Sequence, residues 1–296
     1  MKIAVIGAGK WGSALFDALS AKNECVITSR TPRQIPHFVS VSEALECEAL
    51  VFALAAQQTA QWLDQNFTYK NQKILVASKG IDVASGRFLN EIFEAYVARG
   101  NLAYLSGPSF ATEVMQKLPC ALVVSSCNEN LAELFASTFP VYIKTYTSGD
   151  IIGAEVCGAY KNVIAIASGV CDGLELGNNA RASLIARGIV EIARFGKFFG
   201  ARDETFLGLS GVGDLFLTAS SALSRNYRVG LGLARGKGLE EILRELGEVA
   251  EGVATTKAVV NIATKHKIYA PIATEVAQIL RGKDVRASLK DLLRKK

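Results

Sequence analysis

The stretch Met1–Gly12, MKIAVIGAGKWG, decides the fold of this chain. Residues 3–6 form a short apolar run with β-branched members, which is typical of a strand buried on both faces. Three glycines follow in the pattern G-x-G-x-x-G, and residues 13–19 have helical composition. A strand, this glycine pattern and a helix, in that order, are the context of a dinucleotide-binding site.

Each glycine has its own role in such a site. Gly7 permits the tight turn, Gly9 leaves room for the pyrophosphate, and Gly12 lets the helix pack closely on the strand. The N-terminus of the helix supplies N–H groups and a positive dipole end for the phosphates. A glycine-rich turn without a ligand is the alternative, and the flanking strand and helix favour the dinucleotide.

The composition bounds the remaining possibilities. The chain has 296 residues, of which 50% are hydrophobic and 21% charged, so it suits one large or two smaller domains with a sizeable core. The sequence has no long apolar run without charge and no signal-peptide pattern, so we expect no transmembrane helix. Six cysteines without a C-x-x-C pair indicate core residues in a reducing, cytoplasmic compartment. His37 and His266 lie far apart in sequence, so no metal site is expected.

The net charge of +5 does not indicate nucleic acid. Residues 1–147 carry 12 basic and 12 acidic side chains, and the last 16 residues carry 7 basic and 2 acidic ones. The excess is therefore a charged terminal segment, most simply a solvated helix face, and not a stripe along a groove.

The second expected strand, residues 23–30, bears on the choice of cofactor. In dinucleotide folds an acidic residue about 20 positions after the glycines binds the ribose 2′-OH of NAD. Here the sequence reads Ser29-Arg30-Thr31-Pro32-Arg33, without an acid. Arg30 and Arg33 can pair with a 2′-phosphate, so the sequence favours NADP over NAD. Two solvated loop arginines are the alternative.

Strand and helix patterns alternate through the first half of the chain, which predicts a mostly parallel, doubly wound α/β sheet. Further strands are expected at 48–55, 73–78, 102–106, 121–125 and 141–146, with helices at 88–98 and 131–138. Helical patterns dominate the second half, at 151–169, 181–196, 239–246, 255–265 and 272–280. We therefore expect a Rossmann-type dinucleotide-binding domain at 1–147 and an all-helical, substrate-binding and catalytic domain at 148–296.

Several polar residues are candidates for the site. Lys79 and the segment 107–109 follow expected strands, where ligands lie in open α/β sheets, although ordinary turns fit the local pattern as well. Lys161 and Asn162 interrupt a nearly apolar helix, and a lysine there is either a proton donor or a side chain that reaches the surface. Asp214 follows a glycine turn and is either an active-site acid or a helix N-cap.

The cluster Ser224-Arg225-Asn226 offers a hydroxyl, a guanidinium and an amide, which suit a phosphate or a polyol. A polar cluster at a helix end is the alternative interpretation.

The chain also resembles the bacterial-type NAD(P)-dependent glycerol-3-phosphate dehydrogenases over essentially its whole length. The matching motifs are GAGKWGSALF at 7–16, SKG at 78–80, SGPSFATEV at 106–114, EVCGAYKNVIAIASG at 155–169, GVGDLFLT at 211–218, SRNYRVG at 224–230 and VAEGVATTKAV at 249–259. The resemblance implies reversible reduction of dihydroxyacetone phosphate to sn-glycerol 3-phosphate, for glycerophospholipid synthesis. Its implied partner is a small phosphorylated triose, and it is compatible with a homodimer.

The resemblance also assigns roles. The family's catalytic lysine falls on Lys161, with Asp214 as its acidic partner. The substrate-binding positions are Lys79, Gly107, Ser109, Ser224, Arg225 and Asn226. The cofactor positions are Trp11, Ala111, Val249 and Glu251, and they include Lys79 and Arg225. Together with Gly7, Gly9, Lys10, Gly12, Arg30 and Arg33 they complete the expected cofactor site.

The chain departs from the family in three places. Lys10 replaces the usual serine of the phosphate loop, which puts one cofactor hydrogen bond in doubt. Ala55-Ala56-Gln57 replaces a proline-containing loop, and Ser109 replaces a common threonine while keeping the hydroxyl. The rivals are a ketopantoate or β-hydroxyacid dehydrogenase and a non-catalytic NAD(P)-binding sensor.

Overall fold

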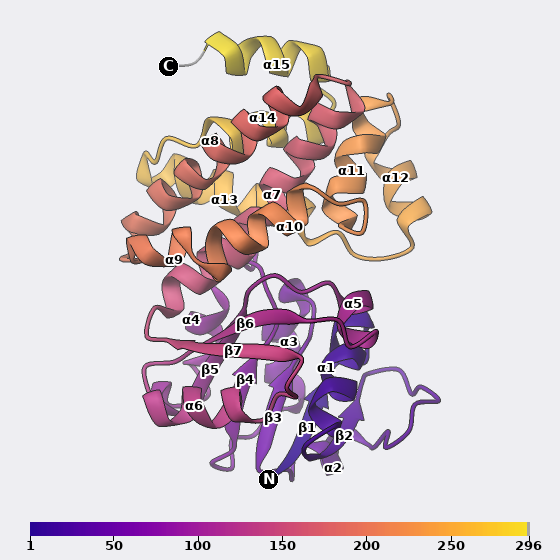
Figure 1. The fold of residues 1–296 in the computed structure, drawn as a ribbon, viewed down its shortest axis with the longest axis vertical. Coiled ribbons are helices and arrows are strands. Elements are labelled where there is room, and N and C mark those ends of the chain that lie inside the picture. Colours follow the sequence, from indigo (N-terminus) through magenta and orange to yellow (C-terminus); the bar gives the residue numbers. More distant parts are fainter. Residues whose placement is uncertain (295–296) are drawn as a thin grey trace. The chain divides into compact units, whose positions relative to one another are not determined.

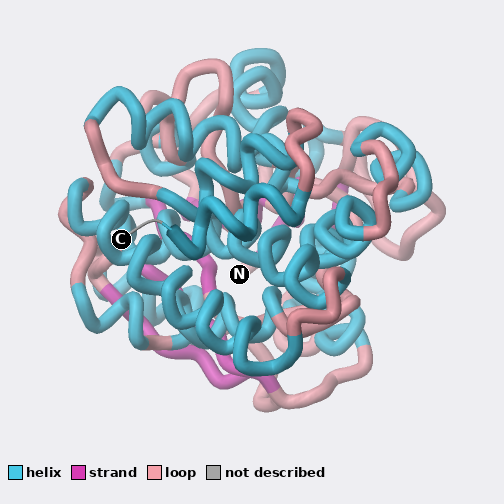
Figure 2. Tube along the Cα trace, turned by 90° about the horizontal axis from the view of Figure 1, so that it is seen from above, coloured by secondary structure: helices cyan, strands magenta, loops and turns pink. Residues whose placement is uncertain are grey.

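The computed structural model describes residues 1–294, and the chain divides into two compact units. Unit 1 contains Met1–Lys79 and Phe88–Glu155, and unit 2 contains Gly80–Arg87 and the chain from Val156 onward. Within the described residues all seven strands belong to unit 1, and unit 2 consists of helices and loops (Figures 1 and 2). The expected fold class, a Rossmann-type α/β domain followed by helices, is confirmed.

The sheet of unit 1 has the strand order β2-β1-β3-β4-β5-β6-β7. Neighbouring strands are parallel except β5 and β6, which pair antiparallel. The strands are β1 (Lys2–Ile6), β2 (Glu24–Thr28), β3 (Ala49–Phe52), β4 (Lys73–Val76), β5 (Leu102–Ser106), β6 (Cys120–Ser125) and β7 (Ile143–Ser148). Every strand that the sequence predicts is therefore present, within a few residues of its expected bounds.

Unit 1 buries an apolar core on each face of this sheet. Ile3 and Val5 of β1 belong to one core, which includes Leu15 of the first helix, and Ala4 and Ile6 belong to the other. Successive side chains of a strand point to opposite faces, so an apolar run of this kind needs helices on both sides. The helices are α1 (Lys10–Ser20), α2 (Val41–Ala44), α3 (Ala56–Asn66), α4 (Leu89–Phe93), α5 (Ala111–Met115) and α6 (Glu129–Ser137), with a 3₁₀ turn, η1, at Arg99–Asn101.

Unit 2 is built around the long helix α7 (Ile151–Gly173), whose first residues lie in unit 1. The other helices are α8 (Gly177–Phe198), α9 (Asp203–Leu207), a π-helical turn η2 (Leu209–Gly213), α10 (Asp214–Ala219), α11 (Arg225–Ala234), α12 (Leu239–Leu246), α13 (Glu251–His266), α14 (Pro271–Leu280) and α15 (Val285–Arg294). By length and composition alone α7 could cross a membrane, but 83% of its apolar window is buried inside the fold. That burial is what the core helix of a globular unit shows.

Two glycines let α7 and α11 approach each other at the backbone. A Cβ on Gly169 would lie 2.0 Å from the carbonyl oxygen of Tyr227, and one on Gly230 would lie 2.0 Å from that of Ile166. Since real Cβ atoms do not approach so closely, only glycine fits at either position. The contact fixes the start of α11 beside α7, where several expected site residues lie.

The two units do not divide at the expected boundary between residues 147 and 148. Ile151 packs in the apolar core of unit 1, and the carboxylate of Glu155 accepts hydrogen bonds from the backbone N–H of Asn90 at 3.0 and 3.2 Å. Unit 1 therefore extends to Glu155, through the first turn of α7. The segment Gly80–Arg87 belongs to unit 2, although the residues directly before and after it belong to unit 1. The functions expected for the two domains stay predictions at this point.

Glu155 also predicts a dependence of stability on pH. Burial raises its pKa from 4.5 to about 8, helped by the negative charges of Glu91 and Glu94 and opposed by the Asn90 N–H. Folding therefore takes up a proton between these two pKa values, and the contribution of Glu155 to the free energy of unfolding falls as the pH rises from about 4.5 through 8. Glu155→Gln keeps an acceptor oxygen but cannot ionise.

We expect Glu155→Gln to gain stability relative to the wild type, by roughly 1 to 3 kcal/mol, between pH 6 and pH 9. Denaturant unfolding at several pH values measures this difference. The control is Glu133→Gln, the same substitution at an exposed position of α6. Parallel pH profiles for Glu155→Gln and wild type would contradict the prediction.

Candidate active site

The turn between β1 and α1 has the geometry that its glycines predict. Gly7 has φ 114°, and a Cβ there would lie 2.6 Å from the carbonyl oxygen of Ala53. A Cβ on Gly12 would lie 1.7 Å from the carbonyl oxygen of Gly7, so α1 packs directly on the turn. A Cβ on Gly9, in contrast, would meet no atom within 4 Å. The open space at Gly9 and the start of α1 behind it fit a pyrophosphate.

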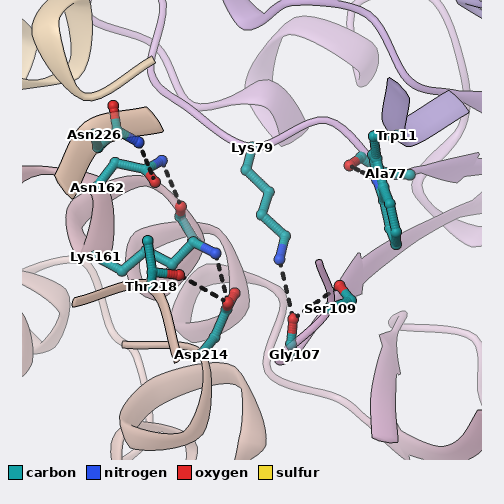
Figure 3. Close-up of polar contacts among 11 residues, drawn as sticks. Trp11, Ala77, Lys79, Gly107, Ser109, Lys161, Asn162, Asp214, Thr218 and Asn226 are labelled. Carbon is teal, nitrogen blue, oxygen red and sulfur yellow. Dashed lines mark hydrogen bonds and ion pairs between the residues drawn. The ribbon is translucent and has the colours of Figure 1, made fainter. Parts of the chain in front are cut away.

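Two further expected cofactor residues lie beside this turn. The indole Nε1 of Trp11 donates a hydrogen bond to the carbonyl oxygen of Ala77 at 3.1 Å, which ties α1 to the end of β4 (Figure 3). Ala111 is the first residue of α5, which packs on α1. Lys10 is the first residue of α1 and is exposed. All three therefore surround the glycine turn within unit 1.

The two arginines that suggest NADP follow the neighbouring strand. The backbone N–H of Gly7 donates to the carbonyl oxygen of Thr28 at 2.8 Å, so the glycine turn adjoins the end of β2. Arg30 and Arg33 come next in the chain, are both exposed, and form no ion pair within residues 1–294. Among the described residues, no acidic side chain competes with a phosphate for these guanidinium groups.

The carboxyl ends of β4 and β5 bring together three of the expected substrate residues. The Nζ of Lys79 donates to the carbonyl oxygen of Gly107 at 3.2 Å, and the Oγ of Ser109 donates to the same oxygen at 3.3 Å (Figure 3). Gly107 has φ 106°, and a Cβ there would lie 3.0 Å from the carbonyl oxygen of Ala121. Parallel pairing of β4 with β5 accounts for the proximity of Lys79 and Gly107.

In unit 2, Lys161 and Asp214 form a buried ion pair. The Nζ of Lys161 lies 2.5 Å from Oδ1 of Asp214, and their side chains are 11% and 1% exposed (Figure 3). Lys161 therefore does not extend to the surface, and Asp214 is the first residue of α10 with its carboxylate committed to the lysine, not an N-cap. Thr218, one turn later in α10, donates from Oγ1 to the same carboxylate oxygen at 3.4 Å.

The segment before Asp214 is shaped to place this carboxylate. Residues Leu209–Gly213 form a single π-helical turn, a structure that often marks functional sites. A Cβ on Gly211 would lie 2.1 Å from the carbonyl oxygen of Phe206, so the turn is packed tightly against the end of α9. Ser168 of α7 donates to the carbonyl oxygen of Ala219 at 2.6 Å and fixes the end of α10 on the helix that carries the lysine.

The amide of Asn226 is held on both sides. Its Nδ2 donates to Oδ1 of Asn162 at 2.8 Å (Figure 3). Its Oδ1 accepts from the backbone N–H of Gly252 at 2.9 Å. A Cβ on Gly252 would lie 2.8 Å from that Oδ1, so only glycine allows this approach. Asn162 directly follows Lys161, and its contact with Asn226 connects α11 to the lysine's segment of α7.

The other two residues of the Ser-Arg-Asn cluster differ in role. Ser224 stabilises the start of a helix, and Arg225 is a candidate ligand-binding residue. Ser224 is the N-cap of α11, where its Oγ accepts from the backbone N–H of Tyr227 at 3.2 Å. The Nη1 of Arg225 lies 3.2 Å from Oε2 of Glu248, and the arginine side chain is 42% exposed. Exposed pairs of this kind contribute little to stability, so Arg225 can exchange Glu248 for another anion at small cost.

Val249 and Glu251 continue the segment that begins at Glu248. Val249 is 55% exposed, and Glu251 is the first residue of α13. The expected site residues thus form one set in each unit. Unit 1 contains Gly7, Gly9, Lys10, Trp11, Gly12, Arg30, Arg33, Lys79, Gly107, Ser109 and Ala111, and unit 2 contains Lys161, Asp214, Ser224, Arg225, Asn226, Val249 and Glu251.

Three contacts of the site were not expected from the sequence. They involve Thr218, Gly252 and the pairing of Asn162 with Asn226. The spacing of Asp214 and Thr218 by four residues on a helix is the one signal that points to such a contact. The other two join segments far apart in the chain, and no local pattern indicates them.

Comparison with known proteins places the chain beside one family. Family models described as the N-terminus and the C-terminus of NAD-dependent glycerol-3-phosphate dehydrogenase match residues 27–132 and 150–290. The glycerol-3-phosphate dehydrogenase [NAD(P)+] of Campylobacter lari is 63% identical over 100% of this chain and 99% of that protein. That of Sulfurimonas denitrificans is 62% identical over 99% of each. The crystal structure of glycerol-3-phosphate dehydrogenase from Coxiella burnetii is 31% identical, with a TM-score of 0.92 and 99% coverage of both chains.

The contrast between Gly9 and Gly12 gives a test of the cofactor site. We expect Gly9→Ala to leave thermal unfolding nearly unchanged and to weaken NADPH binding about tenfold or more, because the new methyl group occupies space open only to the ligand. Gly12→Ala should cost roughly 1 to 3 kcal/mol of stability, because its methyl group overlaps the backbone of Gly7. Calorimetric titration and thermal melts separate the two effects. Unimpaired NADPH binding by Gly9→Ala would show that the turn holds no pyrophosphate.

Proposed function

The chain belongs to the family of NAD-dependent glycerol-3-phosphate dehydrogenases, and on that basis we propose how its residues carry out the reaction. It is an NAD(P)-dependent oxidoreductase that interconverts dihydroxyacetone phosphate and sn-glycerol 3-phosphate. When bound, the nicotinamide cofactor supplies or accepts the hydride. The protein must bind both molecules and move one proton, and the observation that carries this proposal is the buried pair of Lys161 with Asp214.

Lys161 is the proposed general acid and base. In the reducing direction its ammonium donates a hydrogen bond to the C2 carbonyl oxygen of the substrate and transfers a proton from Nζ as that oxygen becomes an alkoxide. In the oxidising direction the neutral amine takes the proton back from the C2 hydroxyl. Asp214 remains a carboxylate throughout, holding the lysine in position with Thr218 as a second hydrogen-bond donor.

The proposed cofactor contacts follow from the open space at Gly9. The backbone of Gly7, Gly9 and Gly12 holds the pyrophosphate at the start of α1, and the adjacent Arg30 and Arg33 bind a 2′-phosphate. Both arginines are exposed, so their effect is a preference for NADP and not an absolute requirement. The cofactor set is completed by Lys10, Trp11, Lys79, Ala111, Arg225, Val249 and Glu251.

The proposed substrate contacts are Lys79, Gly107, Ser109, Ser224, Arg225 and Asn226. Arg225 presents a forked set of donors that matches the oxygens of a phosphate, and its exposed pair with Glu248 is easily exchanged. Asn226 is held rigidly by Asn162 and Gly252, which preorganises its remaining amide hydrogen for a substrate oxygen. Ser224 acts by capping the helix that carries both residues.

We further propose that the enzyme works in the cytoplasm on a small phosphorylated triose. The free thiols of all six cysteines support a reducing compartment. The homodimer that the resemblance allows stays a prediction, for which analytical ultracentrifugation is the direct measurement. A turnover assay with dihydroxyacetone phosphate beside a panel of keto acids separates the proposal from a related reductase and from a non-catalytic NAD(P) sensor.

The catalytic role of Lys161 predicts a specific defect. Lys161→Ala should reduce kcat about 100-fold or more, the usual scale for a proton-transfer group, with little change in NADPH binding. Since the variant also leaves Asp214 buried without its partner, some stability should be lost as well.

A second buried carboxylate with a lysine partner provides the control. Lys283 lies 2.7 Å from the carboxylate of Glu275, whose side chain is 2% exposed, so Lys283→Ala likewise removes the lysine that pairs with a buried acid. We expect Lys283→Ala to lower the melting temperature but to keep kcat near wild type at temperatures well below the melting transition. Equal losses of kcat in the two variants would refute a special role for Lys161.

The arginines after β2 predict the cofactor preference. The wild type should favour NADPH over NADH by roughly tenfold in kcat/KM, because each exposed charged contact contributes on the order of 1 kcal/mol or less. The double variant Arg30→Ala/Arg33→Ala should lose that preference. Lys144→Ala, on β7 at the opposite edge of the sheet from β2, is the control and should keep it. A wild type that prefers NADH, or an unchanged ratio in the double variant, would assign both arginines to the surface alone.

A further inference from the structure

Unit 2 contains a cavity of about 400 Å³ that includes none of the residues proposed for turnover. It lies among α7, α8, α14 and α15, and apolar side chains form most of its wall. Cavities of about 300 to 1,000 Å³ with mostly apolar walls and a few polar groups are typical of sites for small organic molecules. Its size and character are therefore those of a binding site and not of a packing defect.

The cavity exists because α15 is incompletely covered. Val285, Leu289 and Leu292 recur at the spacing of one helix face, line the cavity, and are each only partly buried. α15 packs on α14. Across the cavity Val190 of α8 is 50% exposed. A helix face with partly exposed apolar side chains favours an apolar ligand, because the ligand removes those side chains from water.

One buried polar group in the wall has no partner. Ser288 of α15 is 1% exposed, lines the cavity, and its Oγ makes no hydrogen bond within residues 1–294. A buried hydroxyl without a partner is costly, and a hydrocarbon alone cannot satisfy it. The occupant therefore carries a hydrogen-bonding group as well as an apolar part.

One cation in the wall of the cavity has no ion-pair partner among the described residues. Of its two acids, Glu191 accepts from Tyr160 and from the N–H groups at the start of α14, and Glu275 pairs with Lys283. Arg194 donates to the carbonyl oxygen of Tyr269 and lies over its ring. Arg187 is exposed and has no anionic partner among the described residues. The cavity thus combines an apolar interior with a cation that lacks a counter-charge.

We propose that this cavity binds a single-chain anionic amphiphile. The hydrocarbon chain lies between the leucines of α15 and the exposed face of α8, and the carboxylate or phosphate pairs with Arg187. Ser288 offers its unpaired hydroxyl to a polar group of the ligand. A second copy of the chain would have to insert side chains among four helices and place an anion beside Arg187, so the small amphiphile is the better match.

The test is calorimetric titration of the full chain with decyl phosphate, decanoate, decanol and decyltrimethylammonium. Saturating NADPH and glycerol 3-phosphate are present throughout, so that a phosphate probe cannot enter the substrate site. We expect one site per chain for decyl phosphate or decanoate, with binding at least tenfold tighter than that of the cationic probe. Tighter binding of decanoate identifies the natural head group as a carboxylate, and tighter binding of decyl phosphate identifies it as a phosphate ester.

Paired variants locate the binding. Arg187→Glu should weaken the two anionic probes about tenfold or more and leave decanol within about threefold, whereas Arg244→Glu, at an exposed position of α12, changes neither. Ala180→Trp fills the cavity and should weaken all apolar probes about tenfold or more. Ala182→Trp, exposed on the same helix but outside the cavity, should have no effect.

Three results would overturn the proposal. They are the absence of binding in the wild type, equal binding in Ala180→Trp, and a dimer that binds no probe and that Ala180→Trp dissociates. The last result would assign the cavity to contact between two copies of the chain.

Discussion

The ion pair of Lys161 with Asp214 is the constraint that shapes unit 2. A charged amine inside an apolar helix is tolerable only with a counter-charge close by, and removal of either partner takes away the counter-charge of the other. The surrounding backbone meets that demand. The π-helical turn ends at Asp214, and Ser168 fixes the far end of α10 on the helix that carries the lysine.

Close backbone contacts at glycines fix the positions of the helices that carry the polar groups. Gly169 and Gly230 bring α7 and α11 to backbone distance, and Gly252 brings the start of α13 against Asn226. In unit 1 the approach of Gly12 to Gly7 has the same effect on α1. In each case the absent side chain lets a helix terminus or a polar residue sit closer to its neighbour than any other residue would allow. In unit 2, Lys161, Asp214 and Asn226 therefore lie on helices whose relative positions these contacts fix.

Much of this architecture is predictable from the sequence, because the strongest signals are local. The strands are short apolar runs, and the glycine turn has a distinct spacing, so β1 to β7 and the turn at Gly7 follow from pattern alone. The antiparallel pairing of β6 with β5 does not, since a buried strand reads the same in either direction. The pairing of Asn162 with Asn226 spans 64 residues and depends on the helix contact at Gly169. Lys161 is visible as a charge in an apolar helix, and the family resemblance names Asp214 as its partner, but only the fold shows the direct ion pair between them.

The path of the chain between the units constrains how this protein is made. Unit 1 lacks part of its core until Ile151 has been synthesised, and the start of α4 lacks its acceptor until Glu155 follows. The octapeptide Gly80–Arg87, synthesised early, belongs with helices that are translated only after residue 156. No single cleavage of the polypeptide therefore yields two complete folding units. A nascent chain released at residue 147 would expose an unfinished apolar face and an orphaned loop, both of which invite aggregation or proteolysis.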